Sequence, residues 1–246
     1  MASLAEKNIL VTSVEEFVGR PIAELLAAEG ARVLASDPSF ADEAVRAQFE
    51  GENPSFMAAQ SIEPEALAAE ALDRFDGRID VLVSNDGFPA IRAGVDQAKA
   101  GDMRDGLEAL VVRPFALAGQ LVPAMRRAGG GKLLFVTSAA PMVGLANYGM
   151  YATARGAQNA MVKSLARELA RDHILVNAIA PNFVESPTYF PESLMADDEA
   201  RAKILKNIPL GRLGKPQEVA ELVSFFASDK CGFVTGHVLP VAGGWA

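Results

Sequence analysis

The sequence predicts an α/β fold, a doubly wound, Rossmann-like parallel sheet with helices on both faces. Short apolar runs typical of buried strands alternate along the chain with longer stretches of helical spacing. The length of 246 residues and the hydrophobic content of 50% are enough to bury one large core. We therefore expect a single domain that spans residues 1–246.

Expected strands and helices alternate along the chain, as in a parallel sheet. The expected strands are residues 8–12, 31–36, 79–84, 132–137, 174–180 and 237–243. The expected helices are residues 18–29, 64–75, 103–127, 154–171 and 216–227. Ligands of such sheets bind beyond the carboxyl ends of the strands, so Asn85, Ser138 and Pro181 should converge there. The polar and aromatic segment 182–200 is long for a loop, which is typical of a functional segment.

Composition excludes several classes of function. The 23 basic and 31 acidic residues give a net charge of −8, with no basic stripe, which argues against nucleic acid as a partner. The single cysteine, Cys231, excludes an internal disulfide framework and fits a reducing compartment. The two histidines lie far apart, so we expect no metal site. Without a leader or a run of about eighteen apolar residues, we expect a cytoplasmic protein that does not enter a membrane.

Three polar side chains between residues 138 and 155 form a candidate catalytic set. Ser138 ends a predicted buried strand, and Tyr151 and Arg155 lie four residues apart in a helical pattern, on one helix face. A nearby cation favours the ionised form of a phenol, which makes Tyr151 a candidate base. Ser138 is suited to hydrogen-bond a substrate oxygen. Tyr148 is a rival phenol, but Ala152 rather than a cation lies four residues after it.

These residues resemble the short-chain dehydrogenase/reductase superfamily over nearly the whole chain. The motif SNDG at residues 84–87 lies where that family has N-N-A-G, and Ser138 and Tyr151 have the spacing of its serine and tyrosine. The segments LGRLGKPQEVAELVSFFAS and TGHVLPVAGG resemble the usual ending of the family. The resemblance implies a Rossmann-like fold and suggests a nicotinamide dinucleotide as cofactor.

Two departures argue against that cofactor. After the first strand the family expects T-G-x-x-x-G-x-G, but this chain has TSVEEFVG, with Ser13 and Phe17 at two glycine positions. A bulky ring there takes space from the phosphates, and Glu15 and Glu16 bring negative charge to a helix N-terminus that would otherwise attract phosphate. Arg155 replaces the lysine of the family's tyrosine motif, and the two side chains are not equivalent.

Both departures resemble the halohydrin dehalogenases, a cofactor-free branch of the superfamily with a Ser-Tyr-Arg triad. The resemblance implies reversible conversion of a vicinal haloalcohol into an epoxide, halide and a proton, and epoxide opening by small anions such as azide, cyanide or nitrite. It also implies a homotetramer. It assigns a halide pocket to Phe17, Pro181, Asn182, Phe183, Tyr189 and Phe190, with either Tyr189 or Phe190 facing the halide. For the substrate pocket we expect Phe88, Pro89, Ala140, Met142 and Leu145.

Two other functions stay open. The first is an NAD(P)-dependent oxidoreductase with a degenerate glycine motif, which Asp37, Asn85 and the Gly243-Gly244 pair favour. In the dehalogenase interpretation Asp37 is instead a relic or a helix cap, because Pro38 and Ser39 follow it. The second is a non-catalytic relative that binds a small molecule, which the intact Ser-Tyr-Arg set disfavours.

Overall fold

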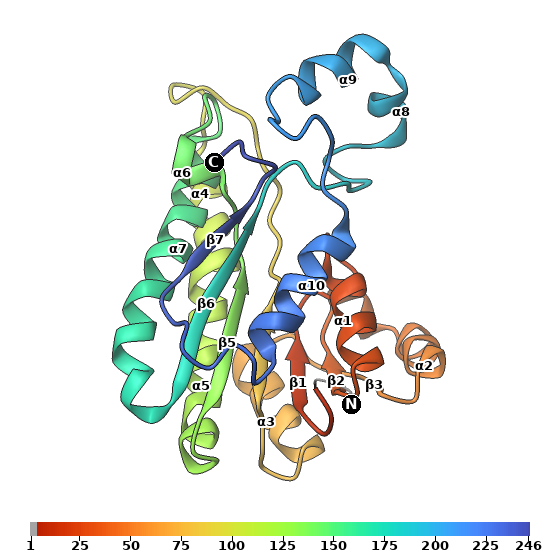
Figure 1. Cartoon of the computed structure of the whole chain (residues 1–246), viewed down its shortest axis with the longest axis vertical. Coiled ribbons are helices and arrows are strands. Elements are labelled where there is room, and N and C mark those ends of the chain that lie inside the picture. Colours follow the sequence, from red (N-terminus) through yellow and green to blue (C-terminus); the bar gives the residue numbers. More distant parts are fainter. Residues whose placement is uncertain (1–3) are drawn as a thin grey trace.

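A seven-stranded parallel sheet forms the centre of the computed structural model, which describes residues 4–246 (Figure 1). The strand order is β3-β2-β1-β4-β5-β6-β7, and all pairings are parallel. The strands are β1 (Asn8–Val11), β2 (Arg32–Ala35), β3 (Phe56–Ala58), β4 (Val81–Ser84), β5 (Gly131–Val136), β6 (Ile174–Pro181) and β7 (Val238–Val241). The order reverses between β1 and β4, so the predicted doubly wound Rossmann-like fold is confirmed.

Helices cover both faces of the sheet. One hydrophobic cluster contains side chains of α1 (Gly19–Ala28), α2 (Glu43–Glu52) and α10 (Pro216–Ala227). The other contains side chains of α3 (Pro64–Arg74), α5 (Arg113–Arg127) and α7 (Gly149–Leu169). The remaining elements are η1 (Pro38–Ala41), α4 (Ala100–Leu107), η2 (Glu108–Val112), α6 (Ala140–Val143), η3 (Ala170–Asp172), α8 (Glu192–Ala196) and α9 (Asp198–Leu205).

The central strands are largely apolar because they are buried on both faces. In β1, Ile9 and Val11 pack in the cluster with α1 and α10, whereas Leu10 between them packs in the cluster with α3 and α5. Successive side chains of a strand point to opposite faces, so a continuous apolar run serves two cores. This arrangement leaves the carboxyl ends of the strands as the place where polar residues gather.

The structure adds elements that the sequence pattern did not predict. β3 has only three residues, and α2 has a weakly apolar pattern that begins after the N-cap Asp42. The segment 182–200, expected as a loop, contains α8 and the beginning of α9, which is capped by Asp197. In Figure 1 these two helices stand above the upper ends of the strands. The helix expected from residue 154 begins at Gly149, so Tyr151 lies inside its first turn.

The expected helix 103–127 consists of α4, the π-helical turn η2 and α5 in one run from Ala100 to Arg127. By length and composition alone this run could cross a membrane. Core helices of soluble proteins have the same length and composition, so these two features alone do not place the run in a membrane. Within this fold Leu117, Leu121 and Met125 of the run are buried in a hydrophobic cluster of the protein.

Candidate active site

Ser138 lies just after β5 and is fixed from two sides. Its Oγ accepts a hydrogen bond from the backbone N–H of Ala140, with an N···O distance of 3.1 Å. The Nδ2 of Asn159 on α7 donates to its carbonyl oxygen at 3.2 Å. Only 4% of Ser138 is exposed. The start of α6 and the helix that carries Tyr151 therefore fix the position of this serine.

Tyr151 and Arg155 lie one turn apart on α7, as predicted. The Nε of Arg155 donates to the phenol oxygen of Tyr151 at 3.3 Å. Because that oxygen accepts a hydrogen bond from a cation, negative charge on it is stabilised. Tyr148, the rival phenol, is instead the residue that precedes the first turn of α7. The geometry therefore favours Tyr151 as the base.

The guanidinium of Arg155 is buried among neutral partners. Its Nη1 donates to the carbonyl of Val136 at 3.1 Å and to Oε1 of Gln158 at 2.9 Å, and its Nη2 donates to the carbonyl of Asp86 at 3.1 Å. Among residues 4–246 it forms no ion pair with a carboxylate. These neutral acceptors orient the cation without cancelling its charge, which remains available to the phenol.

Asp86 is a site residue that sequence reasoning missed. Its carboxyl accepts hydrogen bonds from the hydroxyls of Thr12, at 3.0 Å, and Ser84. Burial raises the pKa of this carboxyl, against opposing contributions from the Ser84 and Thr12 hydrogen bonds and the Arg155 charge. The motif SNDG drew attention to Asn85, but only the fold shows that the carbonyl of Asp86 holds Arg155.

Gln158 was also missed, although the sequence contained a signal for it. It lies three residues after Arg155, on the same helix face, and is fully buried. Its amide oxygen accepts from the guanidinium, so it helps to fix the direction of Arg155. A buried amide three residues after a candidate catalytic arginine is a pattern that the sequence analysis overlooked.

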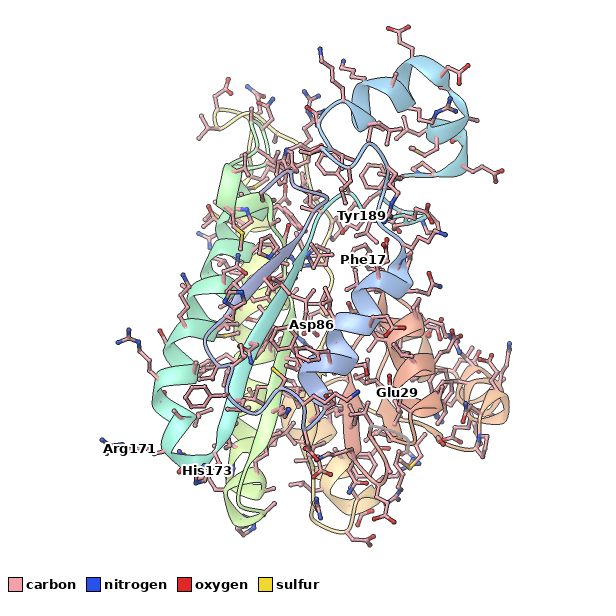
Figure 2. All side chains as sticks on the ribbon, in the orientation of Figure 1. Phe17, Glu29, Asp86, Arg171, His173 and Tyr189 are labelled. Carbon is pink, nitrogen blue, oxygen red and sulfur yellow. The ribbon has the colours of Figure 1, made fainter. Side chains whose placement is uncertain are left out.

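The residues predicted for the halide pocket form two aromatic contacts. Phe17 meets the edge of Tyr189 with ring centroids 5.8 Å apart, and Phe183 packs against Phe190 at 6.1 Å. Burial raises the pKa of Tyr189, and the charge of Tyr151 raises it further. In Figure 2 Tyr189, Phe17 and Asp86 follow one another from α8 and α9 toward the sheet.

The end of β6 holds the other predicted pocket residues. The carbonyl of Pro181 accepts from the N–H of Ala139, which joins this strand end to the Ser138 segment. The side-chain oxygen of Asn182 accepts from the N–H of Phe183, whose φ of 54° lies in the left-handed region. Trp245 packs edge-on against Phe183 with centroids 5.4 Å apart. The sequence analysis did not assign Trp245 to this site.

A small cavity lies directly beside Tyr151. Its walls include the predicted substrate-pocket residues Phe88 and Pro89. The other wall residues are Ile91, Asp102, Gly106, Leu110, Met150 and Ala154. The remaining predicted pocket residues, Ala140, Met142 and Leu145, do not line it. They lie on α6 and just after it, and Met142 is exposed.

The loop between β1 and α1 does not fit a dinucleotide. Ser13 and Phe17 both have a φ of 47°, the conformation in which glycine is usual, yet Phe17 places a ring against Tyr189. The loop N–H groups of Val14, Glu15, Glu16 and Gly19 donate to acceptors of the protein itself. The backbone N–H groups that would donate hydrogen bonds to a phosphate therefore already donate to other acceptors.

Two residues in and beside that loop, Gly19 and Asp37, have structural roles. A Cβ at Gly19 would lie 2.6 Å from the carbonyl oxygen of Val14, so this glycine permits close packing within the loop. The carboxylate of Asp37 accepts from the N–H groups of Glu15 and Ser39 and from the Ser39 hydroxyl. Asp37 therefore caps a helix, as the dehalogenase interpretation of this residue expected, and it also holds the loop through the N–H of Glu15.

Comparison with known proteins finds relatives over nearly the whole chain. The family described as enoyl-(acyl carrier protein) reductase matches residues 15–246. The 3-oxoacyl-(acyl-carrier-protein) reductase FabG of Vibrio cholerae is 33% identical over 244 residues, which is 98% of this chain and 98% of that protein.

Two solved structures are more similar. One, named "Dehalogenation enzyme", is 48% identical, with a TM-score of 0.95 and coverage of 99% of this chain and 100% of that one. The other is halohydrin dehalogenase HheC bound to ethyl (2S)-oxiran-2-ylacetate, which is 37% identical, with a TM-score of 0.90 and coverage of 96% of both chains.

Proposed function

We infer that this chain, which belongs to the halohydrin dehalogenase branch of the short-chain dehydrogenase/reductase superfamily, converts vicinal haloalcohols reversibly into epoxides. The observation that carries this inference is the phenol of Tyr151 hydrogen-bonded to a buried arginine that has no carboxylate partner in residues 4–246. Similarity over the full chain to two dehalogenase structures supports the same reaction.

The proposed mechanism needs only the residues of the chain. Ser138 and Tyr151 hold the hydroxyl oxygen of the substrate, and the Tyr151 phenolate, stabilised by Arg155, takes the hydroxyl proton. The oxygen then attacks the neighbouring carbon, the carbon–halogen bond breaks, and the halide leaves with the bonding electron pair. Tyr151 returns its proton to water. The step is intramolecular and moves no hydride, so positioning supplies much of the rate.

We propose that the leaving halide binds near Phe17, Tyr189 and the turn at Asn182. Support comes from the contact between Phe17 and Tyr189 and from the raised pKa of Tyr189, which keeps its hydroxyl a hydrogen-bond donor. Aromatic edges carry partial positive charge and suit a weakly hydrated anion. Phe190 packs on Phe183, so of the two neighbouring residues we assign Tyr189 to the halide. Small anions such as azide, cyanide or nitrite would use the same place in epoxide opening.

The test is halide release from 1,3-dichloro-2-propanol by the purified protein without added nicotinamide. Tyr151→Phe removes the proton acceptor and should lower the rate of halide release at least about a thousandfold, because the base and a group that binds the substrate oxygen are lost together. The matched control is Tyr148→Phe, which makes the same change three residues earlier, at the N-cap of α7, and should leave release within about twofold. Circular dichroism of each variant checks the fold.

Two outcomes would overturn the proposal. Release by Tyr151→Phe at the wild-type rate would reject Tyr151 as the base. Release that depends on added NADH or NADPH would reject the cofactor-free reaction.

One observation favours the alternative of an NAD(P)-dependent oxidoreductase. A cavity of about 160 Å³ opens beside the β1–α1 loop, and its lining includes Ser13, Ser36 and Asp86. Three features oppose this alternative. The ring of Phe17 packs against Tyr189, the N–H groups of the loop already donate hydrogen bonds within the protein, and the carboxylate of Asp37 already accepts them. Titration with NADH, followed by nucleotide fluorescence, separates the two functions, because saturable binding would favour the oxidoreductase.

We further propose that the enzyme is a cytoplasmic homotetramer. Val112 and Phe115, on the long helical run, are half exposed, as expected of side chains that a second copy covers. The one cysteine is a buried free thiol, which suits a reducing compartment. Sedimentation velocity of the wild type and of Phe115→Asp tests the assembly, since the charge should dissociate it.

A further inference from the structure

The cavity beside Tyr151 is built around an aromatic ring that packs on a helix glycine. Gly106 of α4 is buried, and a Cβ at this position would lie 3.3 Å from both Cδ1 and Cε1 of Phe88. Such a contact is too close to be relaxed, so the ring would have to shift by a few tenths of an ångström. The present position of Phe88 therefore depends on the absence of a side chain at residue 106.

The helix around Gly106 is irregular at the same place. Gly106 is followed by the π-helical turn η2, which carries the fully buried Leu110 into the wall of the same cavity. π-Helical turns are frequent at functional sites. A glycine inside a helix lowers stability by about 1 kcal/mol relative to alanine. Gly101 of the same helix has no atom within 4 Å of the position that a Cβ would take, so it has no comparable contact.

We propose that Gly106 is a specificity-determining residue. By setting the position of the Phe88 ring, it limits the size of the group that the enzyme accepts on the hydroxyl-bearing carbon of the substrate. The proposal rests on the proposed function, in which Tyr151 binds the hydroxyl oxygen. The cavity adjoins Tyr151 and measures about 10 Å³, which is room for about one water-sized group. A methyl group on the hydroxyl-bearing carbon fits this space, whereas an aryl group requires the Phe88 ring to move.

The test compares two chlorohydrins that differ only in that group. 1-Chloro-2-propanol carries a methyl group on the hydroxyl-bearing carbon, and 2-chloro-1-phenylethanol carries a phenyl group. Chloride release gives kcat/KM for each, and the phenyl-to-methyl ratio measures selectivity. Phe88→Ala should raise this ratio about tenfold or more, and Gly106→Ala should lower it by a similar factor, because small changes in an apolar pocket have effects of about this size.

Two further variants separate ring displacement from other effects. Gly101→Ala makes the same change earlier in the same helix and should leave the ratio unchanged. In the double variant with Phe88→Ala, the Gly106→Ala change should no longer affect the ratio, because the ring that it displaces is gone. Both alanines that replace glycine favour helix, so the variants should fold.

The outcomes distinguish this inference from the proposed function. If the wild type releases chloride neither from these two chlorohydrins nor from 1,3-dichloro-2-propanol, the proposed function fails and the selectivity inference falls with it. If the wild type acts on 1,3-dichloro-2-propanol but on neither of the two chlorohydrins, the selectivity inference alone is wrong. If the wild type is active but Gly106→Ala leaves the ratio unchanged, or changes it equally with and without the Phe88 ring, the selectivity inference alone is wrong.

Discussion

The carboxyl group of Asp86 gives a prediction about stability and pH. Because burial raises its pKa, the folded protein binds a proton at this carboxyl more tightly than the unfolded chain, whose group titrates near the ordinary value of 3.8. Stability from this group is therefore fully present below pH 3.8 and is lost as pH rises through the folded pKa. Asp86→Asn replaces the titrating carboxyl by an amide of similar shape that cannot ionise, and so removes this loss.

One titrating proton changes the free energy of unfolding by at most about 1.4 kcal/mol per pH unit. For a chain of this size, about 1 kcal/mol corresponds to about 2–4 °C in Tm. Thermal unfolding of wild type and Asp86→Asn between pH 4 and pH 8 should thus show the variant gaining up to about 3–6 °C per pH unit relative to wild type within the titration window. Asp105→Asn, at an exposed site on α4, is the control and should show no such trend.

A difference between wild type and Asp86→Asn that stays constant from pH 4 to pH 8 would refute the reasoning. So would a wild type that gains stability over the variant as pH rises. Either result would mean that the folded protein holds Asp86 as a carboxylate, and that Arg155 is partly neutralised by it.

Single contacts give three further predictions. Arg155→Lys should lower kcat/KM for halide release at least about a hundredfold, because one ammonium cannot reach the acceptors that the guanidinium spans; activity within a few fold of wild type would contradict this. Phe17→Gly should be more stable than Phe17→Ala by about 1 kcal/mol in urea unfolding, since glycine adopts the φ of 47° without the steric cost that a Cβ brings; a Phe17→Ala variant more stable than Phe17→Gly would count against this. The pKa of Glu218 is lowered from 4.5 to about 2, mainly by the hydrogen bond from Arg212 and next by the hydrogen bond from the backbone N–H of Lys215. Glu218→Gln should therefore be less stable than wild type above pH 4.5, and the difference should disappear as pH falls toward about 2; a difference that persists at the lowest pH would show that the ion pair does not stabilise the fold.

The sequence determined the features that depend on local spacing. Alternating strand and helix patterns predicted the doubly wound sheet, because side-chain periodicity reports which face of an element is buried. The four-residue spacing of Tyr151 and Arg155 predicted their contact, since a helix turn brings such residues together. The loss of two glycines after β1 was also visible in the sequence, although not that Ser13 and Phe17 would keep the backbone conformation of glycine.

Only the tertiary structure decided the contacts between distant segments. Asp86 lies 69 residues before Arg155, and no local pattern relates its carbonyl to the guanidinium. The same holds for Tyr189 against Phe17, Trp245 against Phe183 and Gly106 against Phe88, which depend on how separate segments of the chain pack together. Short-range periodicity contains no information on the distance between such segments. The contact between the candidate base Tyr151 and Arg155 could be predicted from the sequence, but the groups that orient Arg155 and the size of the cavity beside Tyr151 were set by packing.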